Sequence, residues 1–483
     1  MFSSVPGSRV TLARDAPAPA MGQGGAARQA GTLRGMSLAA GGRRTRRSFL
    51  GVVALGGAAT LVAACAPGQT PAPTTAPTPA APKPAAAPAS PAPATSPAAA
   101  ASPAVAASPA ASPAAAPAIS PAASPSQAAQ PIRKPLPPNA FVPFGSNAEM
   151  RFEALSRDQY LVPAANFFVR DHASTPLVDE KTWKLSIEGS GVDKPFTLTY
   201  DELIALPPTT VTRYIECAGN GRGFYNELLH QPAQGTQWHL GAFGVAEWKG
   251  VRVAELLDRA GVKRSAVDVV GIGLDPPQVQ RPMSIDKAMQ DDTLVAYAIN
   301  GQPLLPDSGF PARLLTPGWI GVANIKWLGS LQVVEQKAYT DWNTRTYVLI
   351  GPDYQPQPPS LGPIINDQVM KSAVALPWPA TLKPGSQTVW GYAWSPSGKI
   401  SKVDVSLDGG ASFQAARLID PNVEKAGVRW ELTFDARPGE MTITPRATDD
   451  EGNAQPTDPS TQKWNEQGYL FAVAVPHPVT VAA

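Results

Sequence analysis

A run of alanine, proline, serine and threonine fills residues 66–131 and limits which part of this chain can fold. Lys83 is the only charged residue in the run, and the whole chain holds 54 prolines in 483 residues. A segment of this composition has too few large apolar side chains to bury a core. It is expected to extend as a polyproline-like spacer of ~3.1 Å per residue, roughly 200 Å when fully stretched. We therefore predict a disordered tether over residues 66–140, whose glycosylation the sequence leaves open.

Residues 1–65 have the layout of an export signal. Four arginines between positions 43 and 47 precede an apolar run over residues 49–64. These 16 residues fall short of the ~20 that a transmembrane helix needs. The string around Arg46 and Arg47 resembles the twin-arginine motif, whose pathway exports proteins already folded, often around a cofactor. We therefore expect export by this pathway and, with it, a bound cofactor.

Cys65 closes this signal. Together with residues 62–64 it resembles a bacterial lipobox, in which the cysteine is acylated and becomes the mature N-terminus. An acylated Cys65 would anchor an extracytoplasmic lipoprotein to the membrane, whereas the alternative is plain cleavage near this position. Met36 would give a signal of ordinary length, so the sequence leaves the start open between Met1 and Met36.

Two folded units are predicted after the tether. Residues 141–370 mix short apolar strands, such as 183–187, with stretches of helical periodicity, such as 253–260, and this mixture is typical of an α+β fold. In residues 371–483, strand-like runs alternate with clusters of Gly, Pro, Asp and Asn, which favours an all-β immunoglobulin-like sandwich. Asp408 and Gly409 form a hairpin signal. The strands of this second unit are expected at residues 388–393, 402–407, 428–434 and 441–447.

Charge and histidine content exclude several classes of function. The formal charge of +2 is nearly neutral and no basic block recurs in the folded half, so nucleic acid is not an expected partner. The chain has four histidines and neither a Cys-x-x-Cys nor a His-Glu-x-x-His motif, which argues against a zinc cluster and against covalently attached haem. The histidines are His172, His230, His239 and His477.

Cys217 is the single cysteine of the folded half, and it stands among small residues close to Arg222. A thiolate is a soft metal ligand and also a nucleophile, and the small neighbours permit close approach of a ligand. A catalytic nucleophile would need a histidine base, which His172, His230 or His239 offers. Taken alone, Cys217 therefore fits a metal ligand, a nucleophile or a buried core residue.

Several motifs narrow these alternatives. The sequence Cys-Ala-Gly-Asn-x-Arg at residues 217–222 resembles the molybdenum-ligand loop of the sulfite oxidase family. Further segments occur in the order typical of that family, and the resemblance covers the chain from about residue 141 to its end. These segments are Phe-Val-Arg-Asp-His at 168–172, Gly-Phe-Pro-Ala-Arg at 309–313, Lys-Trp-Leu at 326–328, Gly-Tyr-Ala-Trp-Ser at 391–395 and Val-Asp-Val-Ser-Leu-Asp-Gly-Gly at 403–410.

The resemblance implies an oxo-molybdenum centre held by one molybdopterin and by a single protein ligand, Cys217. Arginine grips phosphate and planar groups bidentately, which suits the pterin's phosphate and polar ring. The positions implied to bind the pterin are His172, Asp275, Ser308, Arg313, Asn324 and Lys326. The second unit resembles the family's immunoglobulin-like dimerisation domain, which implies a homodimer.

The family's substrate-pocket residues correspond to Arg170 and Arg222, and its active-site tyrosine corresponds to Tyr347. Three positions depart from the family pattern. Ser308 stands where a histidine is common, Gly221 replaces an arginine, and Gln467 stands where animal and plant enzymes place another substrate-pocket arginine. One positive charge is thus missing from the expected anion pocket, which widens the range of substrates to consider.

The leading hypothesis is oxidation of sulfite to sulfate outside the cytoplasm. No haem domain is fused in the matched region, so electrons are expected to pass to a separate acceptor such as a c-type cytochrome. One alternative is a molybdenum reductase acting on sulfoxides or on another small oxyanion, and a neutral sulfoxide would not need a pair of arginines. A further alternative is a non-catalytic envelope lipoprotein that binds partners through the second unit.

Overall fold

Alternation and helical spacing in the sequence account for the local structure of the first folded unit. The computed structural model describes residues 131–483. Strand β4 (Lys184–Glu188) buries Leu185 and Ile187 on one face and exposes its charged ends, as period-2 alternation requires. Helix α3 (Val253–Arg259) buries Val253, Leu256 and Leu257, which lie three to four positions apart along one face. Both elements therefore follow the pattern predicted from their apolar residues.

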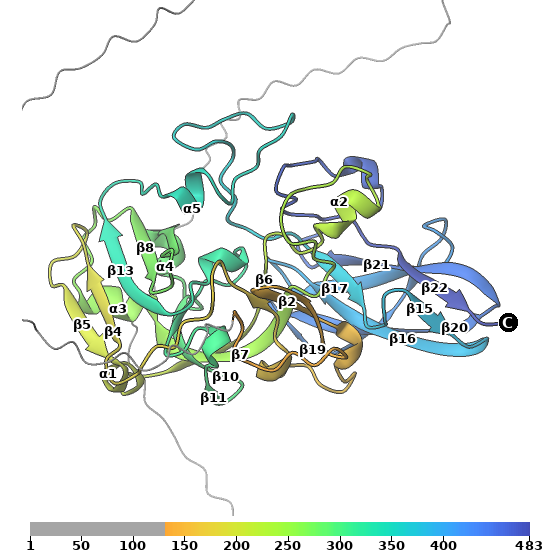
Figure 1. Ribbon diagram of the computed structural model, residues 1–483, viewed down its shortest axis with the longest axis horizontal. Helices are drawn as coiled ribbons and strands as arrows, with labels where there is room; N and C mark the ends of the chain where they lie inside the picture. The colour runs from red at the N-terminus through yellow and green to blue at the C-terminus, as the bar shows by residue number, and fades with distance from the viewer. Residues whose placement is uncertain (1–130) are drawn as a thin grey trace, which may run out of the picture. The chain divides into compact units, whose positions relative to one another are not determined.

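Three sheets make up the part of the chain before residue 370. The smallest has the order β1-β2-β3, the second β11-β10-β7-β6 with β12 also paired to β10, and the third β5-β4-β13-β8-β9, whose labelled strands can be followed in Figure 1. The strands are β1 (Phe141–Phe144), β2 (Asn147–Met150), β3 (Val169–Arg170), β5 (Phe196–Thr199), β6 (Thr209–Glu216), β7 (Phe243–Arg252), β8 (Asp268–Gly273), β9 (Gln280–Ser284), β10 (Leu294–Ile299), β11 (Gln302–Pro303), β12 (Arg313–Leu315) and β13 (Leu328–Val334).

The helices of the described residues are short. Helix α1 is closed at its N-terminus by a capping box, in which the Thr199 side chain accepts from the Glu202 amide and the Glu202 side chain accepts from the Thr199 amide. Besides α3, the α-helices are α1 (Tyr200–Ile204), α2 (Gly223–Glu227), α4 (Ile285–Ala288) and α5 (Asp341–Thr344). The 3-10 turns are η1 (Phe152–Ala154), η2 (Ala164–Asn166), η3 (Pro306–Ser308), η4 (Gly321–Ala323) and η5 (Pro459–Thr461).

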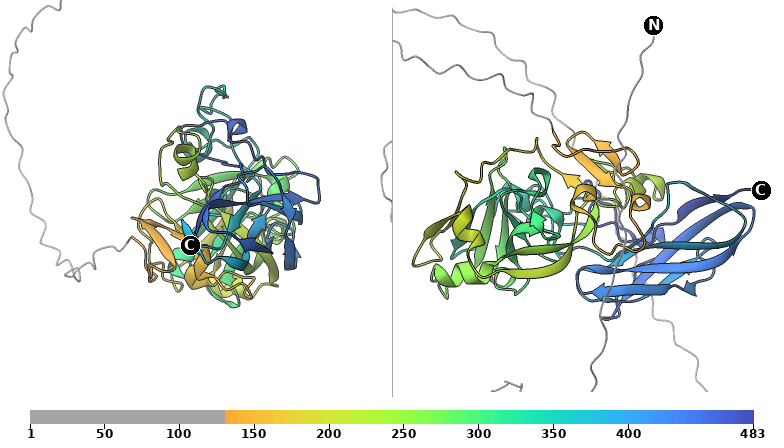
Figure 2. Two further views of the ribbon diagram at one scale, coloured as in Figure 1. Left: turned by 90° about the vertical axis from the view of Figure 1, so that its right-hand side faces the viewer. Right: turned by 90° about the horizontal axis from the view of Figure 1, so that it is seen from below.

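The remainder of the chain forms a two-sheet sandwich, here called the C-terminal sandwich (residues 371–483). One sheet has the order β14-β16-β20-β19 and the other β15-β22-β21-β17-β18. Val389 and Trp430 of the first sheet share a buried core with Val403 and Ile443 of the second. Figure 2 shows these strands from two further sides. They are β14 (Lys371–Val374), β15 (Ala380–Leu382), β16 (Gly385–Trp394), β17 (Ile400–Ser406), β18 (Gln414–Ala415), β19 (Arg417–Val423), β20 (Gly427–Ala436), β21 (Gly439–Asp449) and β22 (His477–Val481).

The predicted strands at 388–393, 402–407, 428–434 and 441–447 lie within or overlap β16, β17, β20 and β21. The hairpin signal at Asp408 and Gly409 also marks a real reversal between β17 and β18. The loop is longer than two residues, because the Asp408 carboxylate accepts from the amide and hydroxyl of Ser412. The described residues are mostly β with few and short helices, so the expected α+β mixture is confirmed only in part.

Residues 131–140 belong to the range predicted for the tether, but they contact the folded part. Ile132 is buried, and the backbone amides of Arg133 and Lys134 donate to the Asp307 carboxylate at 2.7 to 3.2 Å. The predicted end of the tether at residue 140 is therefore wrong, because residues 131–140 pack on the folded part, and the prediction stays untested before residue 131. That earlier segment, with Cys65 and the predicted export signal, lies outside the described residues.

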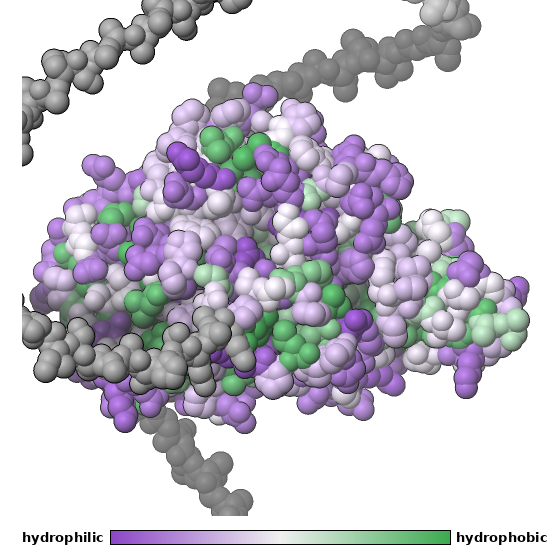
Figure 3. Space-filling model, in the orientation of Figure 1, coloured by the Kyte–Doolittle hydropathy of each residue, from purple (hydrophilic) through white to green (hydrophobic). Residues whose placement is uncertain are grey.

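Hydrophilic side chains cover most of the face drawn in Figure 3, and hydrophobic residues occur there in small scattered groups. Within residues 131–483, none of the helices has the length and apolar character required to cross a bilayer.

Candidate active site

One cavity, partly open to solvent, collects nearly all the residues singled out in the sequence. Its wall is assembled from the end of β3, the loop after β6, the β8–β9 connection, the η3–β12 segment, the η4–β13 segment and the residues after α5. Arg222 is the one predicted site residue that does not line it. The predicted residues on the wall are Arg170, His172, Cys217, Asp275, Ser308, Arg313, Asn324, Lys326 and Tyr347.

Cys217 follows the last residue of β6 and is 5% exposed, and its amide donates to the Ala242 carbonyl at 3.0 Å. Glycines let other backbone approach this loop closely. A Cβ on Gly321 would lie 2.8 Å from the Glu216 carbonyl oxygen, closer than such contacts occur. The thiol is therefore held on the cavity wall by a tightly packed backbone rather than by a flexible loop.

Arg313, the first residue of β12, is a buried cation without a carboxylate partner. It donates to the backbone carbonyls of Ser308 at 3.0 Å and Asn324 at 2.8 Å, while its Nε has no partner. No Asp or Glu within the described chain lies in salt-bridge distance of it. Burial lowers the pKa of Arg313 to about 9, with Asp171 opposing the shift. A buried, uncompensated guanidinium on a cavity wall is suited to receive an anion.

Lys326 is anchored by one carboxylate and one backbone carbonyl. Its Nζ donates to the Asp171 carboxylate and, at 3.0 Å, to the Asp307 carbonyl, and it lies 4.6 Å from the Trp327 ring centroid. Burial lowers the pKa of Lys326, and Asp171 opposes that shift. Thr175 joins the two acids by donating to Asp307 at 2.6 Å while lying 2.9 Å from an Asp171 oxygen. This network holds the ammonium group at the cavity wall.

Arg170 brings a third cation to the cavity from the end of β3. Its guanidinium donates to the Asp171 carbonyl and to Asn147 Oδ1 at 3.4 Å, and no carboxylate among the described residues pairs with it. Burial works to lower the pKa of Arg170, but Tyr347 and Cys217 nearby raise it overall. Arg170 therefore stays charged and keeps donor capacity for a ligand.

His172 and Tyr347 are joined by a hydrogen bond of 2.9 Å between Nε2 and the phenol oxygen. Burial, aided by Arg170 and Lys326, lowers the pKa of His172 to about 2, so the imidazole is neutral. Trp342 packs edge-on against His172, with 4.5 Å between ring centroids. Tyr347 has a positive φ of 53°, uncommon for a bulky residue and a feature that often marks functional sites.

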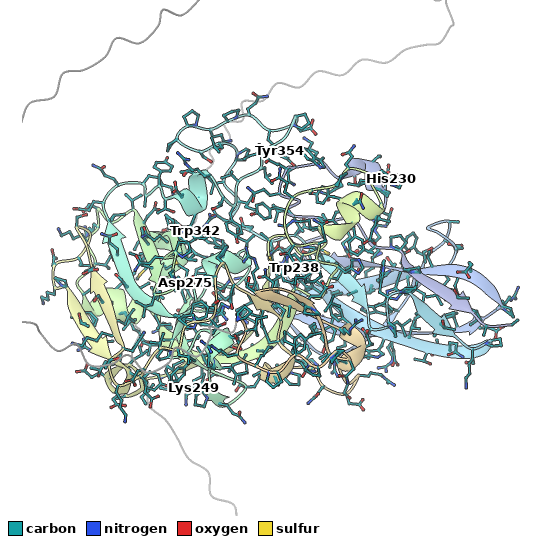
Figure 4. All side chains as sticks on the ribbon, viewed as in Figure 1. His230, Trp238, Lys249, Asp275, Trp342 and Tyr354 are labelled. Atoms are coloured by element: carbon teal, nitrogen blue, oxygen red, sulfur yellow. The ribbon has the colours of Figure 1, made fainter. Side chains whose placement is uncertain are left out.

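The remaining wall residues contribute carboxyl and backbone groups. Asp275 is 4% exposed, and burial raises the pKa of its carboxyl. It lies in the β8–β9 connection and is labelled in Figure 4 together with Trp342. Ser308 offers its carbonyl to Arg313, and Asn324 accepts from the Thr316 amide at 2.8 Å. Ser308 and Asn324 thus orient Arg313 through their backbone carbonyls.

Arg222 lies behind the wall. It donates to the carbonyls of Gln467 at 2.6 Å and Thr236 at 2.8 Å, and its guanidinium carbon lies 5.4 Å from the Tyr469 ring centroid. Tyr469 stacks on Tyr347 at 5.2 Å and donates through its hydroxyl to Gln467 Oε1. Arg222 does not line the cavity, and its Nε and one terminal nitrogen donate to backbone oxygens, so its direct contribution to the anion pocket stays a prediction.

The departure at Gly221 has a steric reason. Its φ is +93°, and a Cβ there would lie 3.1 Å from Phe471 Cβ. A larger residue would have to adopt a left-handed conformation against an aromatic side chain, which favours glycine. Its amide donates to the His239 carbonyl at 2.6 Å, so the turn is fixed on both sides.

Sequence reasoning missed the acids that hold Lys326. Asp171 belongs to a motif noted above, yet its pairing with a lysine 155 positions away gives no local signal. Asp307 was likewise passed over. Arg281 is a third case, because it is 1% exposed and holds Trp342 and Ile365 through their backbone carbonyls. Residues 131–483 contain no cluster of three or more His, Cys, Asp or Glu side chains arranged to hold a metal ion.

Residues 172–342 match the family described as the oxidoreductase molybdopterin binding domain, and residues 363–477 match the Mo-co oxidoreductase dimerisation domain. The chain is 34% identical to mitochondrial sulfite oxidase of Homo sapiens over 362 residues, 71% of this chain and 65% of that protein. It is also 34% identical to sulfite oxidase of Gallus gallus over 363 residues, 71% of this chain and 78% of that protein.

A solved structure shares the fold. The sulfane dehydrogenase SoxCD from Paracoccus pantotrophus is 29% identical, with a TM-score of 0.63 over 71% of this chain and 88% of that one. The present chain spans about 65% of the length of the mammalian mitochondrial sulfite oxidases that it matches.

Proposed function

Because the chain belongs to the sulfite oxidase family of molybdopterin oxidoreductases, we propose that it oxidises a small sulfur oxyanion, sulfite first, to a product with one more oxygen. One observation carries the proposal. The free thiol of Cys217 and the carboxylate-free guanidinium of Arg170 line the same cavity. A soft ligand beside an anion receptor is the combination that metal-dependent oxidation of an oxyanion needs.

The residues present fit the implied cofactor. A molybdopterin bears a phosphate and a polar ring, and the buried Arg313 has an unpartnered Nε and no carboxylate within the described chain. Arg313 and Lys326 would hold the anionic end, Asp275 and Asn324 would meet the polar ring, and Cys217 would bind the metal. When bound, the cofactor supplies a redox metal that takes an electron pair from the substrate.

The chain's own side chains bind and orient the substrate. Arg170 attracts the oxyanion through a guanidinium that pairs with no carboxylate among the described residues. Neutral His172 holds the Tyr347 hydroxyl at 2.9 Å, so that hydroxyl is oriented as a hydrogen-bond partner for substrate oxygen. Phe168 and Trp327 add aromatic surface to the cavity wall.

Gln467 affects which substrate charge the site can accept. It supplies a neutral amide next to Tyr469, where animal and plant relatives are expected to carry an arginine. Arg222 does not line the cavity, so Arg170 is the cation that the wall offers to the substrate beside those assigned to the cofactor. A singly charged or larger sulfur anion is therefore proposed beside sulfite as a substrate to screen.

The context of the enzyme is proposed from the N-terminal sequence. The protein is exported by the twin-arginine pathway and tethered outside the cytoplasm through a lipid on Cys65. Electrons then pass to a separate acceptor such as a c-type cytochrome. The C-terminal sandwich is assigned as immunoglobulin-like and, since it matches a dimerisation domain, as the contact of a homodimer.

The test is sulfite-dependent reduction of ferricyanide and of cytochrome c by protein purified under molybdate-replete expression. Turnover that requires both sulfite and molybdenum is expected. Tungstate-grown protein is the control, because it retains the fold but replaces the metal. Absence of turnover with sulfite and with the other sulfur anions of the screen, in protein shown to contain molybdenum, would refute the proposal.

A further inference from the structure

Glu216, the residue before Cys217, carries a completely buried carboxylate with an unusual set of partners. Its Oε1 accepts from Lys371 Nζ at 2.6 Å and from Asn220 Nδ2 at 2.9 Å, and its Oε2 accepts from Trp394 Nε1 at 2.9 Å. The side chains of Glu216 and Lys371 are 0% and 2% exposed. Lys371 begins β14 and Trp394 ends β16, so two of the three donors come from the C-terminal sandwich.

Stability alone does not explain this arrangement. The desolvation penalty of a buried ion pair offsets most of its attraction, and an apolar pair of similar volume often stabilises a fold equally well. The pair does impose a fixed geometry, because removing either partner leaves an uncompensated buried charge. We therefore expect the ion pair to fix the position of the backbone next to Glu216.

Neighbouring hydrogen bonds connect the fixed Glu216 side chain to the backbone of Cys217. The Glu216 carbonyl accepts from Gln368 Nε2 at 2.7 Å, just before the sandwich begins. Asn220 bridges the loop, because its amide nitrogen donates to Glu216 while its Oδ1 accepts from the Ala242 amide at 3.0 Å. The Ala242 carbonyl in turn accepts from the Cys217 amide at 3.0 Å. The backbone of Cys217 is thus part of a ring of hydrogen bonds that includes the Glu216 carboxylate.

We propose that Glu216, clamped by Lys371 and Trp394 of the C-terminal sandwich, is a positioning residue for Cys217. The C-terminal sandwich would then help to position the metal ligand, in addition to any role in dimerisation. Partners of this kind orient metal ligands, and their loss typically lowers metal affinity or activity by roughly 10- to 100-fold. The inference rests on the proposed role of Cys217 as metal ligand.

The experiment compares Lys371→Met, which removes the charge but keeps a long side chain, with Trp394→Phe, which keeps a ring but removes the donor. Ser372→Ala is the matched control. Ser372 lies next to Lys371 on the same strand and is equally buried, but its hydroxyl bonds only to Pro445 and Gln455 of the sandwich. The measurements are molybdenum content, the Mo(V) electron paramagnetic resonance spectrum and thermal unfolding.

Lys371→Met is expected to lower molybdenum content or activity by roughly 10-fold or more and to shift the Mo(V) spectrum. Trp394→Phe should shift the spectrum less, and Lys371→Arg should restore it in part. Ser372→Ala should lower the unfolding temperature without changing the spectrum. A folded Lys371→Met protein with the wild-type molybdenum content and spectrum would overturn the inference.

A second readout separates this inference from the proposed function. The alkylation rate of Cys217 can be followed by mass spectrometry in cofactor-free protein, which needs no molybdenum. The rate should change in Lys371→Met and not in Ser372→Ala. If wild-type protein never binds molybdenum, the proposed function fails, whereas an unchanged alkylation rate in Lys371→Met counts against the positioning role itself.

Discussion

Arg170 and Arg313 line the same cavity, but their surroundings assign them different partners. Two terminal nitrogens of Arg313 donate to backbone carbonyls, which fix the orientation of the guanidinium, and its Nε has no partner. Arg170 donates to the Asp171 carbonyl and weakly to Asn147 at 3.4 Å, and it pairs with no carboxylate among the described residues. Arg313 therefore suits the anionic group of a permanently bound cofactor, and Arg170 suits a substrate anion that binds and dissociates.

Arg170→Gln should weaken sulfite binding more than it slows turnover. A hydrogen bond to a charged group contributes about 1.5–3 kcal/mol, which corresponds to roughly a 10- to 100-fold increase in KM. Steady-state kinetics with ferricyanide would measure it, with molybdenum content confirming that the site is loaded. An unchanged KM would show that Arg170 does not hold the substrate.

Arg313→Met should have opposite effects on the loaded and the cofactor-free protein. Molybdenum content should fall by roughly 10-fold, because an anchor for the cofactor is lost. The unfolding temperature of the cofactor-free protein should stay the same or rise, since an uncompensated buried charge disappears. Equal molybdenum content in variant and wild type would remove Arg313 from the cofactor site.

Glu149 predicts a pH effect away from the cavity. Burial raises the pKa of this carboxyl from 4.5 to about 7, with His239 opposing the shift. Between these values the folded protein keeps a proton that the unfolded chain releases, so this contribution to stability is lost as the pH rises through the window.

Glu149→Gln should therefore be more stable relative to wild type at pH 8 than at pH 5, by at most roughly 3 kcal/mol. Urea denaturation at the two pH values measures the difference. The same difference at both pH values would mean that Glu149 does not titrate abnormally.

At the scale of elements, the spacing of apolar residues correctly predicted individual strands and helices, because these depend mainly on neighbouring residues. The alternation around Leu185 placed β4, and the helical spacing from Val253 placed α3. The Cys217 loop and most cavity residues were also identified, because the family's motifs are contiguous. The Lys371–Glu216 pair was not foreseen, since it joins positions 155 apart and depends on how a sandwich packs against a loop. Arg222 was assigned to the substrate pocket from its motif alone, which carries no information about the oxygens that its guanidinium meets, and that role stays a prediction.

Gly321 tests the contact between η4 and the Cys217 loop. In Gly321→Ala the new methyl would press on the Glu216 carbonyl and on Cys217 Cα, 2.8 and 3.2 Å from its ideal position. We expect a clear loss of molybdenum content. Gly301→Ala is the control, because a Cβ there meets nothing within 4 Å, and it should cost only about 1 kcal/mol of backbone strain. Similar molybdenum contents in both variants would show that the loop yields without consequence.

At the scale of the whole molecule, a catalytic unit and a sandwich are preceded by the long proline-rich segment and the predicted export signal. Cys65→Ser should release the protein from the membrane fraction while leaving its export and its sulfite-dependent activity unchanged. Fractionation with labelled fatty acid measures this. Equal membrane association and labelling of the variant would point to plain cleavage rather than to a lipid anchor.

The account depends most on Cys217 as the protein ligand to molybdenum. X-ray absorption at the molybdenum edge, on wild type and Cys217→Ser from molybdate-replete cells, tests this directly. The account predicts one fewer sulfur neighbour of molybdenum in the variant, together with loss of sulfite-dependent turnover. The same number of sulfur neighbours in both proteins, or normal turnover by the variant, would contradict it.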